Sequence, residues 1–127
     1  MAGNTNLAYR ALCRKFGAEL TTTEMVSSMA LRHNDTKSLG YLAKASNETP
    51  VAAQIFGADP ETLAIAVGSV QERGFDIVDL NVGCPVPKIT GGGGGSALLL
   101  EPQLAFDCVS AMIEAATVPV TVKIRAG

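Results

Sequence analysis

The stretch "VAAQIFGADPETLAIAVGSVQERGFDIVDLN", residues 51–81, decides the fold class. A short apolar run at each of its ends predicts a β-strand. Between them, Asp59 followed by Pro60 marks a helix start, because an aspartate caps the free N–H groups of the first turn and proline fits the first helical position. Gly74 follows the last turn, as glycine does at many helix C-termini. The stretch therefore predicts a strand, a helix and a second strand.

The same alternation extends in both directions along the chain. We expect strands at Leu20–Thr23, Val51–Phe56, Phe75–Leu80 and Val118–Ile124. We expect helices at Leu7–Phe16, Pro60–Arg73 and Glu101–Ala116, with only short helices between Ser27 and Ala45. Strands that alternate with helices form parallel sheets, and nearly unbroken apolar runs are typical of strands covered on both faces. A doubly wound sheet and a (β/α)8 barrel both fit this pattern.

Polar residues at the strand ends favour the barrel. Four consecutive predicted strands carry a polar residue at or near the C-terminal end, namely Glu24, Gln54, Asn81 and Lys123. Barrel enzymes assemble their active sites from the C-terminal ends of many strands, whereas open sheets concentrate function at one switch point. A complete barrel needs about 250 residues, and the chain has 127. The sequence predicts a partial TIM (β/α)8 barrel with parallel strands, roughly strands 2–5 with their helices.

Composition and charge are those of an ordinary α/β protein. Ten basic residues against twelve acidic ones give a formal net charge of −2, and without a run of Lys or Arg the charge alone indicates no nucleic-acid partner. The three cysteines have neither metal-ligand spacing nor the pattern of a disulfide framework, which favours a reduced compartment. The sequence has no signal-peptide pattern and no apolar run of about 18 residues. We therefore expect a cytoplasmic protein without a metal site.

Cys84 differs from the other two cysteines in its setting. Cys13 and Cys108 fall inside predicted helices, where cysteine is usually a small buried apolar residue. Cys84 follows Asn81 just beyond a predicted strand and precedes Pro85, in a loop at the functional end of the sheet. A thiol there acts as a nucleophile or as a general acid, depending on its pKa. Since no histidine is adjacent in the sequence, the general-acid role is supported at least as well as the nucleophilic role.

Two polar residues inside apolar strands indicate a ligand. Burying an unpaired lysine costs several kcal/mol, so Lys123 is either a surface lysine on an edge strand or a cation that binds an anionic or electron-rich cofactor. A buried amide such as Gln54 needs hydrogen-bond partners, which a planar heterocycle would supply. Asn81 and Glu24 also have simple structural interpretations. Asn81 would cap the end of a strand, and Glu24 would accept hydrogen bonds from backbone amides. His33 fits a solvated helix end, and we assign it no role.

The run of five glycines at 91–95 has two interpretations. It is either a flexible linker or a segment where the backbone approaches a ligand closely or forms a mobile lid. Neither of the standard glycine-rich phosphate-binding motifs is present.

The chain resembles the tRNA-dihydrouridine synthases. The similarity is ungapped, covers essentially the whole chain, and includes "MAGNTN", "TEM" around Glu24, "VAAQIFGADP", "DLNVGCPVPK", "GSALL" and "PVTVKIRAG". The combination of NxGCP with a later VKIR is its most specific part. Members of this family are flavoproteins with an N-terminal barrel and a C-terminal helical RNA-binding domain. The resemblance thus implies that residues 1–127 are the N-terminal half of an FMN-binding barrel, with the C-terminal half-barrel and the helical domain absent.

The resemblance also implies a reaction and roles for individual residues. Reduced FMN would deliver a hydride to C6 of a uridine in tRNA and Cys84 would protonate C5, giving 5,6-dihydrouridine, with NADPH as the reductant of the flavin. Asn81 and Glu24 would bind the substrate. The glycine loop would let a flipped nucleotide come close. FMN would be contacted by Met1, Ala2, Gln54 and Lys123.

The chain departs from the family pattern at a few places. The proline that usually precedes the opening Met1 is absent, and Gly91 stands where the family often has a basic residue. The later strands, which in the family carry the FMN phosphate site, are missing, and we expect tRNA binding to need the absent helical domain. Two alternatives stay open: an FMN barrel acting on a free pyrimidine, like dihydroorotate dehydrogenase, and an inactive truncated fragment. The first would be expected to have asparagine where Val86 stands.

Overall fold

The structure is a computed structural model and describes residues 2–126. Its helices are α1 (Leu7–Lys15), α2 (Ser28–Arg32), α3 (Thr36–Gly40), α4 (Pro60–Glu72), α5 (Pro87–Thr90), the 3-10 helix η1 (Gly95–Leu100) and α6 (Pro102–Ala115). Its strands are β1 (Thr21–Thr22), β2 (Val26–Ser27), β3 (Val51–Phe56), β4 (Ile77–Asn81) and β5 (Val120–Lys123). Strands and helices alternate along most of the chain, as the sequence predicts.

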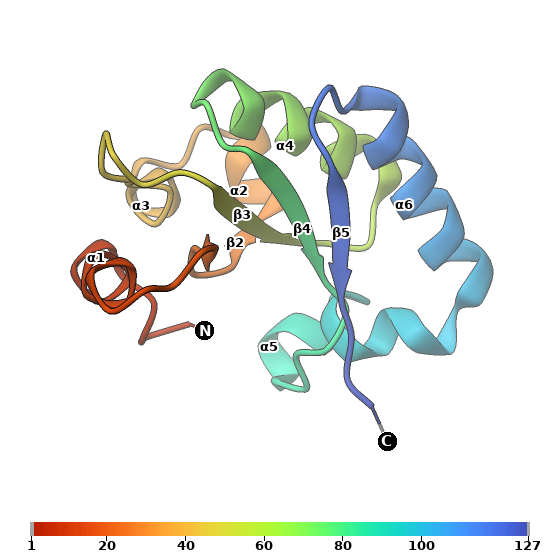
Figure 1. Cartoon of the computed structure of the whole chain (residues 1–127). Helices are drawn as coiled ribbons and strands as arrows, with labels where there is room; N and C mark the ends of the chain where they lie inside the picture. Colours follow the sequence, from red (N-terminus) through yellow and green to blue (C-terminus); the bar gives the residue numbers. More distant parts are fainter. Residues whose placement is uncertain (1, 127) are drawn as a thin grey trace.

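The strands form one open parallel sheet in the order β1-β3-β4-β5, and β2 also pairs with β3 (Figure 1). β1 and β2 lie end to end along β3, because Thr21 pairs with Val51 and Val26 pairs with Ile55. At the other side of the sheet, Asn81 of β4 pairs with Lys123 of β5. Every connection in this sheet joins parallel strands, so the C-terminal ends of β3, β4 and β5 lie at the same edge. The predicted parallel α/β sheet is confirmed.

The core lies between the sheet and the helices on one of its faces. Helices α2, α4 and α6 lie together on that face (Figure 1), with α4 packed against both α2 and α6. Because side chains alternate between the two faces of a strand, every second residue of β3 and β4 enters this core. These residues are fully or almost fully buried and include Val51, Ala53, Ile55, Val78 and Leu80, and Val82 continues the pattern just beyond β4. The opposite face carries the residues between them and holds the candidate site.

A buried ion pair attaches α1 to the edge of the sheet. The Nε atom of Arg10 lies 2.7 Å from Oε1 of Glu48, and both side chains are 2 % exposed. The Thr21 hydroxyl donates to the same carboxylate oxygen at 2.8 Å, and the guanidinium also donates to the carbonyl of Ala43 at 2.6 Å. These bonds offset the cost of burying both charges. They connect α1, β1 and the segment before β3.

The observed elements differ from the predicted ones mainly in short segments. The strand at 51–56 and the helix starts at Leu7 and Pro60 agree with the prediction. β1 is shorter than predicted, and the prediction missed β2 and α5, since neither is long enough to show a periodic pattern. The glycine run leads into η1 and is no linker. In residues 2–126 no helix has the length and apolar character needed to cross a membrane.

Candidate active site

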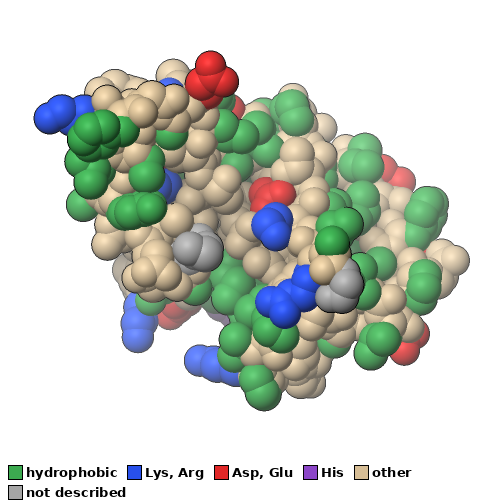
Figure 2. Space-filling view, turned by 60° about the horizontal axis from the view of Figure 1, so that its bottom comes forward, with side chains coloured by type: hydrophobic (Ala, Val, Ile, Leu, Met, Phe, Trp, Pro, Cys, Tyr) green, Lys and Arg blue, Asp and Glu red, His purple; other side chains and the backbone are tan. Residues whose placement is uncertain are grey.

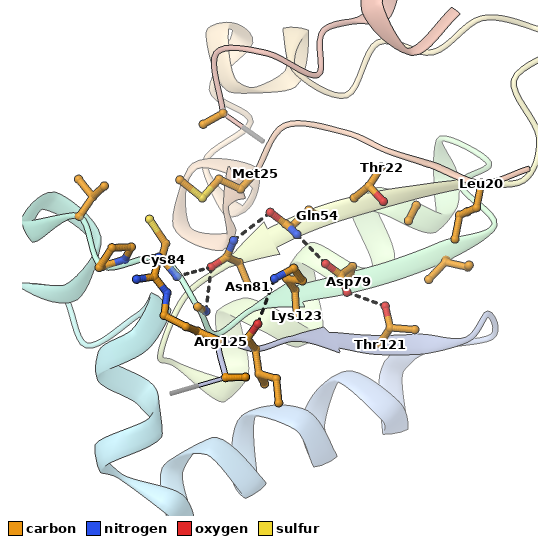
Figure 3. A pocket seen from close by; sticks show the side chains of 18 residues that line it. Leu20, Thr22, Met25, Gln54, Asp79, Asn81, Cys84, Thr121, Lys123 and Arg125 are labelled. Atoms are coloured by element: carbon orange, nitrogen blue, oxygen red, sulfur yellow. Dashed lines mark hydrogen bonds between the residues drawn. The ribbon is translucent and has the colours of Figure 1, made fainter. Parts of the chain in front are cut away.

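A cavity of about 1000 Å³ lies on the face of the sheet opposite the helices (Figure 3). Alternate residues of β3, β4 and β5 form its floor, since these residues point away from the helical core. The polar side chains that the sequence singles out on these strands therefore lie together on this face. The walls include Ala2, Met25, Gln54, Asn81, Cys84 and Lys123.

The structure brings most of the predicted site residues together and separates one. Ala2, Gln54, Asn81, Cys84 and Lys123 all line the cavity. Met1 lies outside the described residues, so the structure says nothing of its predicted contact.

Glu24 does not line the cavity. Glu24 is 8 % exposed, and its carboxylate accepts a hydrogen bond from the backbone N–H of Gly3. This is the backbone-acceptor interpretation that the sequence left open, and it ties the N-terminal segment with Ala2 to the loop between β1 and β2. A direct contact between Glu24 and a substrate stays a prediction.

The loop that carries Cys84 is fixed by hydrogen bonds from both directions. On one side, Oδ1 of Asn81 accepts the N–H groups of Gly83 at 3.2 Å and of Cys84 at 2.9 Å. On the other, the carbonyl of Cys84 accepts the N–H of Ser96 at 2.9 Å. The Cys84 side chain is half-buried and lies among the side chains of the cavity wall (Figure 3). The strand end thus places the thiol at the cavity, where a proton donor has access to a bound ligand.

The glycine run serves this loop through close backbone contact. Gly95 has φ +59°, and a Cβ atom there would lie 2.4 Å from the carbonyl oxygen of Cys84. Gly94 also lies beside a backbone segment, since its Cβ would be 3.6 Å from the backbone of Gly57. Both are buried. This close approach is one of backbone to backbone, and these two glycines are buried. The expected approach of the glycine loop to a nucleotide stays a prediction.

A row of hydrogen bonds crosses the cavity floor from β5 to the Cys84 loop (Figure 3). The Thr121 hydroxyl donates to Oδ1 of Asp79 at 2.6 Å. Gln54 donates from Nε2 to Oδ2 of Asp79 at 2.7 Å and accepts at Oε1 from Nδ2 of Asn81 at 2.9 Å. Gln54 and Asp79 are each 8 % exposed. The partners expected for the buried amide of Gln54 are therefore protein groups, and only part of its hydrogen-bonding capacity is left for a ligand.

Lys123 combines features of both interpretations given above. It stands on β5, at the edge of the described sheet, and its side chain is exposed. Its Nζ donates to the carbonyl of Ile124 at 3.0 Å, and no carboxylate of residues 2–126 forms an ion pair with it. Because it also lines the cavity beside Asn81, its positive charge is available to a ligand there.

Sequence reasoning missed several residues of this site, including Asp79, Thr121 and Met25. Asp79 had a signal that could have found it, since an acidic residue inside an apolar strand raises the same question as Gln54. Thr121 and Met25 had none, because threonine is common in strands and methionine is common in cores.

Several basic side chains lie on the face of the molecule where the cavity opens. Figure 2 looks toward the C-terminal ends of the strands, and several Lys and Arg side chains gather on this face. Lys123 and Arg125 line the cavity itself, and Lys88 follows the Cys84 loop on α5. Within residues 2–126, no three His, Cys, Asp or Glu side chains converge as metal ligands. The local charge at the mouth is therefore positive although the chain as a whole is slightly acidic.

Comparison with known proteins decides which family this geometry belongs to. The sequence matches the family described as Dihydrouridine synthase (Dus) over residues 1–127. The chain belongs to the dihydrouridine synthase family. Relatives include tRNA-dihydrouridine synthase B of Pseudomonas syringae pv. tomato, 42% identical over 127 residues, which cover all of this chain and 38% of the relative. A probable tRNA-dihydrouridine synthase of Treponema pallidum is 42% identical over 136 residues, covering all of this chain and 39% of the relative.

A third relative carries a more specific name. The tRNA-dihydrouridine(20/20a) synthase of Vibrio parahaemolyticus is 44% identical over 120 residues, which cover 91% of this chain and 36% of the relative. The chain thus spans less than two-fifths of the length of these relatives. Dihydrouridine synthases form TIM barrels, and the open sheet seen here is one arc of such a barrel, with its inner face lining the cavity.

Proposed function

We propose that this chain carries part of the active site of a flavin-dependent enzyme that reduces uridine in tRNA to 5,6-dihydrouridine. One observation carries the proposal: Cys84, Gln54 and Lys123 line the same cavity in a chain that belongs to the dihydrouridine synthase family. The names of the relatives add the substrate class, since they are called tRNA-dihydrouridine synthases.

The cavity has the properties of a site for FMN. Its volume of about 1000 Å³ is that of a site for a large ligand, and a few polar groups converge on an otherwise apolar wall. In the described chain Gln54 keeps one N–H without a protein acceptor, and Lys123 supplies a positive charge. These two residues, with Met1 and Ala2, would hold the flavin. When bound, FMN would supply the hydride for C6 of the uracil, and NADPH is the proposed source of its electrons.

Cys84 acts as the general acid in this proposal. Reduction of the uracil C5–C6 bond needs one hydride at C6 and one proton at C5, and the Cys84 thiol provides that proton. Asn81 holds the loop of the thiol and orients the base. A stacked base does not present C5 and C6 to a buried site, so the nucleotide must leave its stack, at a cost of a few kcal/mol.

The remaining parts of the proposal concern the whole protein. We assign residues 1–127 to the N-terminal half of the FMN-binding barrel, and tRNA binding to a helical domain outside them. A cytoplasmic location follows from the tRNA substrate. Gly91, where the family often has a basic residue, contributes no charge to RNA. Activity on a free pyrimidine receives no support from the names of the relatives, nor from Val86 at the position where that class is expected to have asparagine.

The test uses Cys84→Ala in the natural polypeptide at its full length. Removing one general acid is expected to slow dihydrouridine formation by about 10²- to 10⁴-fold, while flavin reduction by NADPH continues nearly as before. Cys13→Ala is the matched control and should change neither step. Equal loss of both steps in Cys84→Ala would contradict the general-acid role. For residues 1–127 alone, a purified chain that shows no flavin absorption after incubation with FMN would contradict the cofactor site.

A further inference from the structure

The hydrogen-bond row across the cavity floor has a fixed direction. At one end stand backbone N–H groups, which only donate, and they bind Oδ1 of Asn81. At the other end stands the carboxylate of Asp79, which only accepts. The amides of Asn81 and Gln54 lie between these ends. With both ends fixed, one orientation of each amide satisfies every contact, and a flipped Gln54 would place its oxygen 2.7 Å from a carboxylate oxygen.

We propose that Asp79 is a positioning residue that makes Gln54 present an N–H donor to the cavity. Gln54 uses one N–H for Asp79 and its oxygen for Asn81, so the second N–H is the group left for a ligand. The ligand atom that meets Gln54 is therefore an acceptor, such as a ring carbonyl. That last step rests on the proposed function, since it takes the flavin as the ligand. Through Asn81, the same row also holds the backbone N–H groups of Gly83 and Cys84.

Charge alone does not explain why an acid stands at residue 79. No Lys or Arg of the described chain forms an ion pair with Asp79, although the residue is 8 % exposed. Each of its two carboxylate oxygens instead accepts one short hydrogen bond, from Thr121 and from Gln54. A buried acid held only by neutral donors costs stability compared with an apolar residue, so its acceptor character is what the site uses.

The proposal predicts how substitutions at both positions combine. Asp79→Asn keeps an oxygen for Gln54 and places its NH2 on the Thr121 hydroxyl, which both donates and accepts, so this variant separates the acceptor oxygen of residue 79 from its negative charge. Gln54→Glu puts two carboxylates against each other and breaks the row. The double variant Gln54→Glu/Asp79→Asn restores it, because the amide introduced at position 79 donates to the carboxylate introduced at position 54, and Asn81 still has its acceptor. In the double variant, however, residue 54 offers no N–H to the cavity.

The first measurement is hydrogen exchange of backbone amides by NMR, without FMN or RNA, in the natural full-length polypeptide. Exchange at the Cys84 amide, relative to amides within α4, should rise about tenfold in Gln54→Glu. It should return to the wild-type rate in the double variant and stay there in Asp79→Asn. Unchanged exchange in Gln54→Glu, or no recovery in the double variant, would overturn the proposed row.

The second measurement is FMN affinity by flavin fluorescence. Gln54→Glu and the double variant should both bind FMN about tenfold more weakly than Asp79→Asn, since each lacks the N–H donor that Asp79→Asn keeps. Wild-type affinity in the double variant would overturn the donor assignment. Failure of the wild type to bind FMN would instead overturn the proposed function, while the exchange measurement would still decide the role of Asp79.

Discussion

Replacement of Gly95 by alanine is the sharpest structural test of the Cys84 loop. A Cβ atom at residue 95 would lie 2.4 Å from the carbonyl oxygen of Cys84, and real Cβ atoms essentially never come closer than 3.0 Å. The oxygen is a backbone atom held by the N–H of Ser96 at 2.9 Å, so a side-chain rotation cannot relieve the clash. Either the Cys84 loop or the start of η1 must move by about 0.6 Å.

The expected loss of stability has two parts. The left-handed backbone at φ +59° costs alanine about 1–2 kcal/mol, and forcing a methyl group into a packed site costs about 1–3 kcal/mol more. Gly95→Ala should therefore destabilise by about 2–5 kcal/mol. Gly93→Ala carries the first cost, with φ +79°, but its nearest contact is 3.2 Å, to the Ala58 Cβ. It should lose about 1–2 kcal/mol.

Gly92→Ala is the matched control. Its Cβ would meet only an ordinary contact, 3.7 Å from the Ile89 carbonyl, and its φ is not in the left-handed region. This variant should leave the free energy of unfolding unchanged or raise it by up to about 1 kcal/mol, because alanine restricts the unfolded chain more than glycine does. Three neighbouring glycines thus give three different expected values.

The assay combines urea unfolding of the natural full-length polypeptide with the rate of Cys84 alkylation, measured by peptide mass spectrometry. Gly95→Ala should lower the unfolding free energy and change the alkylation rate, because the displaced carbonyl belongs to the reacting residue. If all three variants lose the same stability, or if Gly95→Ala leaves the alkylation rate unchanged, the close backbone contact is not what the glycines provide.

Two further predictions concern ionisable groups. Burial raises the pKa of the Glu48 carboxyl, but hydrogen bonds from Arg10 and Thr21 outweigh it and hold the pKa below the ordinary 4.5. The stabilisation that the Glu48 carboxylate contributes to the free energy of unfolding is therefore complete above pH 4.5. It is lost as the pH falls through the lower, folded-state pKa. Glu48→Gln should lack this part of the curve of unfolding free energy against pH, and an identical curve would contradict it. Burial, with two nearby carboxylates, raises the pKa of the Cys108 thiol to about 11, so iodoacetamide near pH 8 should label Cys84 and leave Cys108 unmodified. Labelling of Cys108 first would contradict this.

The parts of the fold that sequence predicted best are those where a repeated pattern and a local signal agree. The strand at 51–56 and the helix that starts at Pro60 were predictable because an apolar run, a capping Asp59 and a following Gly74 all indicate the same boundaries. β2 has two residues and α5 has four. Segments of that length are set by tertiary contacts, which no local pattern reports.

In the candidate site, too, local sequence patterns were predictive and tertiary contacts were not. Gln54 and Lys123 were predictable as cavity residues because a polar group in an apolar strand needs a partner. What the sequence could not show is which partner it has. The nearest acceptor of Gln54 is Asp79, one strand away and 25 positions later, and only the register of β3 with β4 brings them together. The glycine run was ambiguous for a related reason, since five identical residues contain no information on which of them meets another backbone.

Two findings that the sequence did not predict concern the same residue, Cys84. The glycine run constrains the carbonyl of Cys84, and the polar row constrains its N–H through Asn81. The loop is thus held at both backbone groups of the residue that carries the thiol, while the side chain itself is left half-buried at the cavity. The general-acid role proposed above requires a thiol that is fixed in position and still free to exchange a proton. Holding it through its backbone meets both needs, and Asn81 and Gly95 both act on the backbone of this one residue.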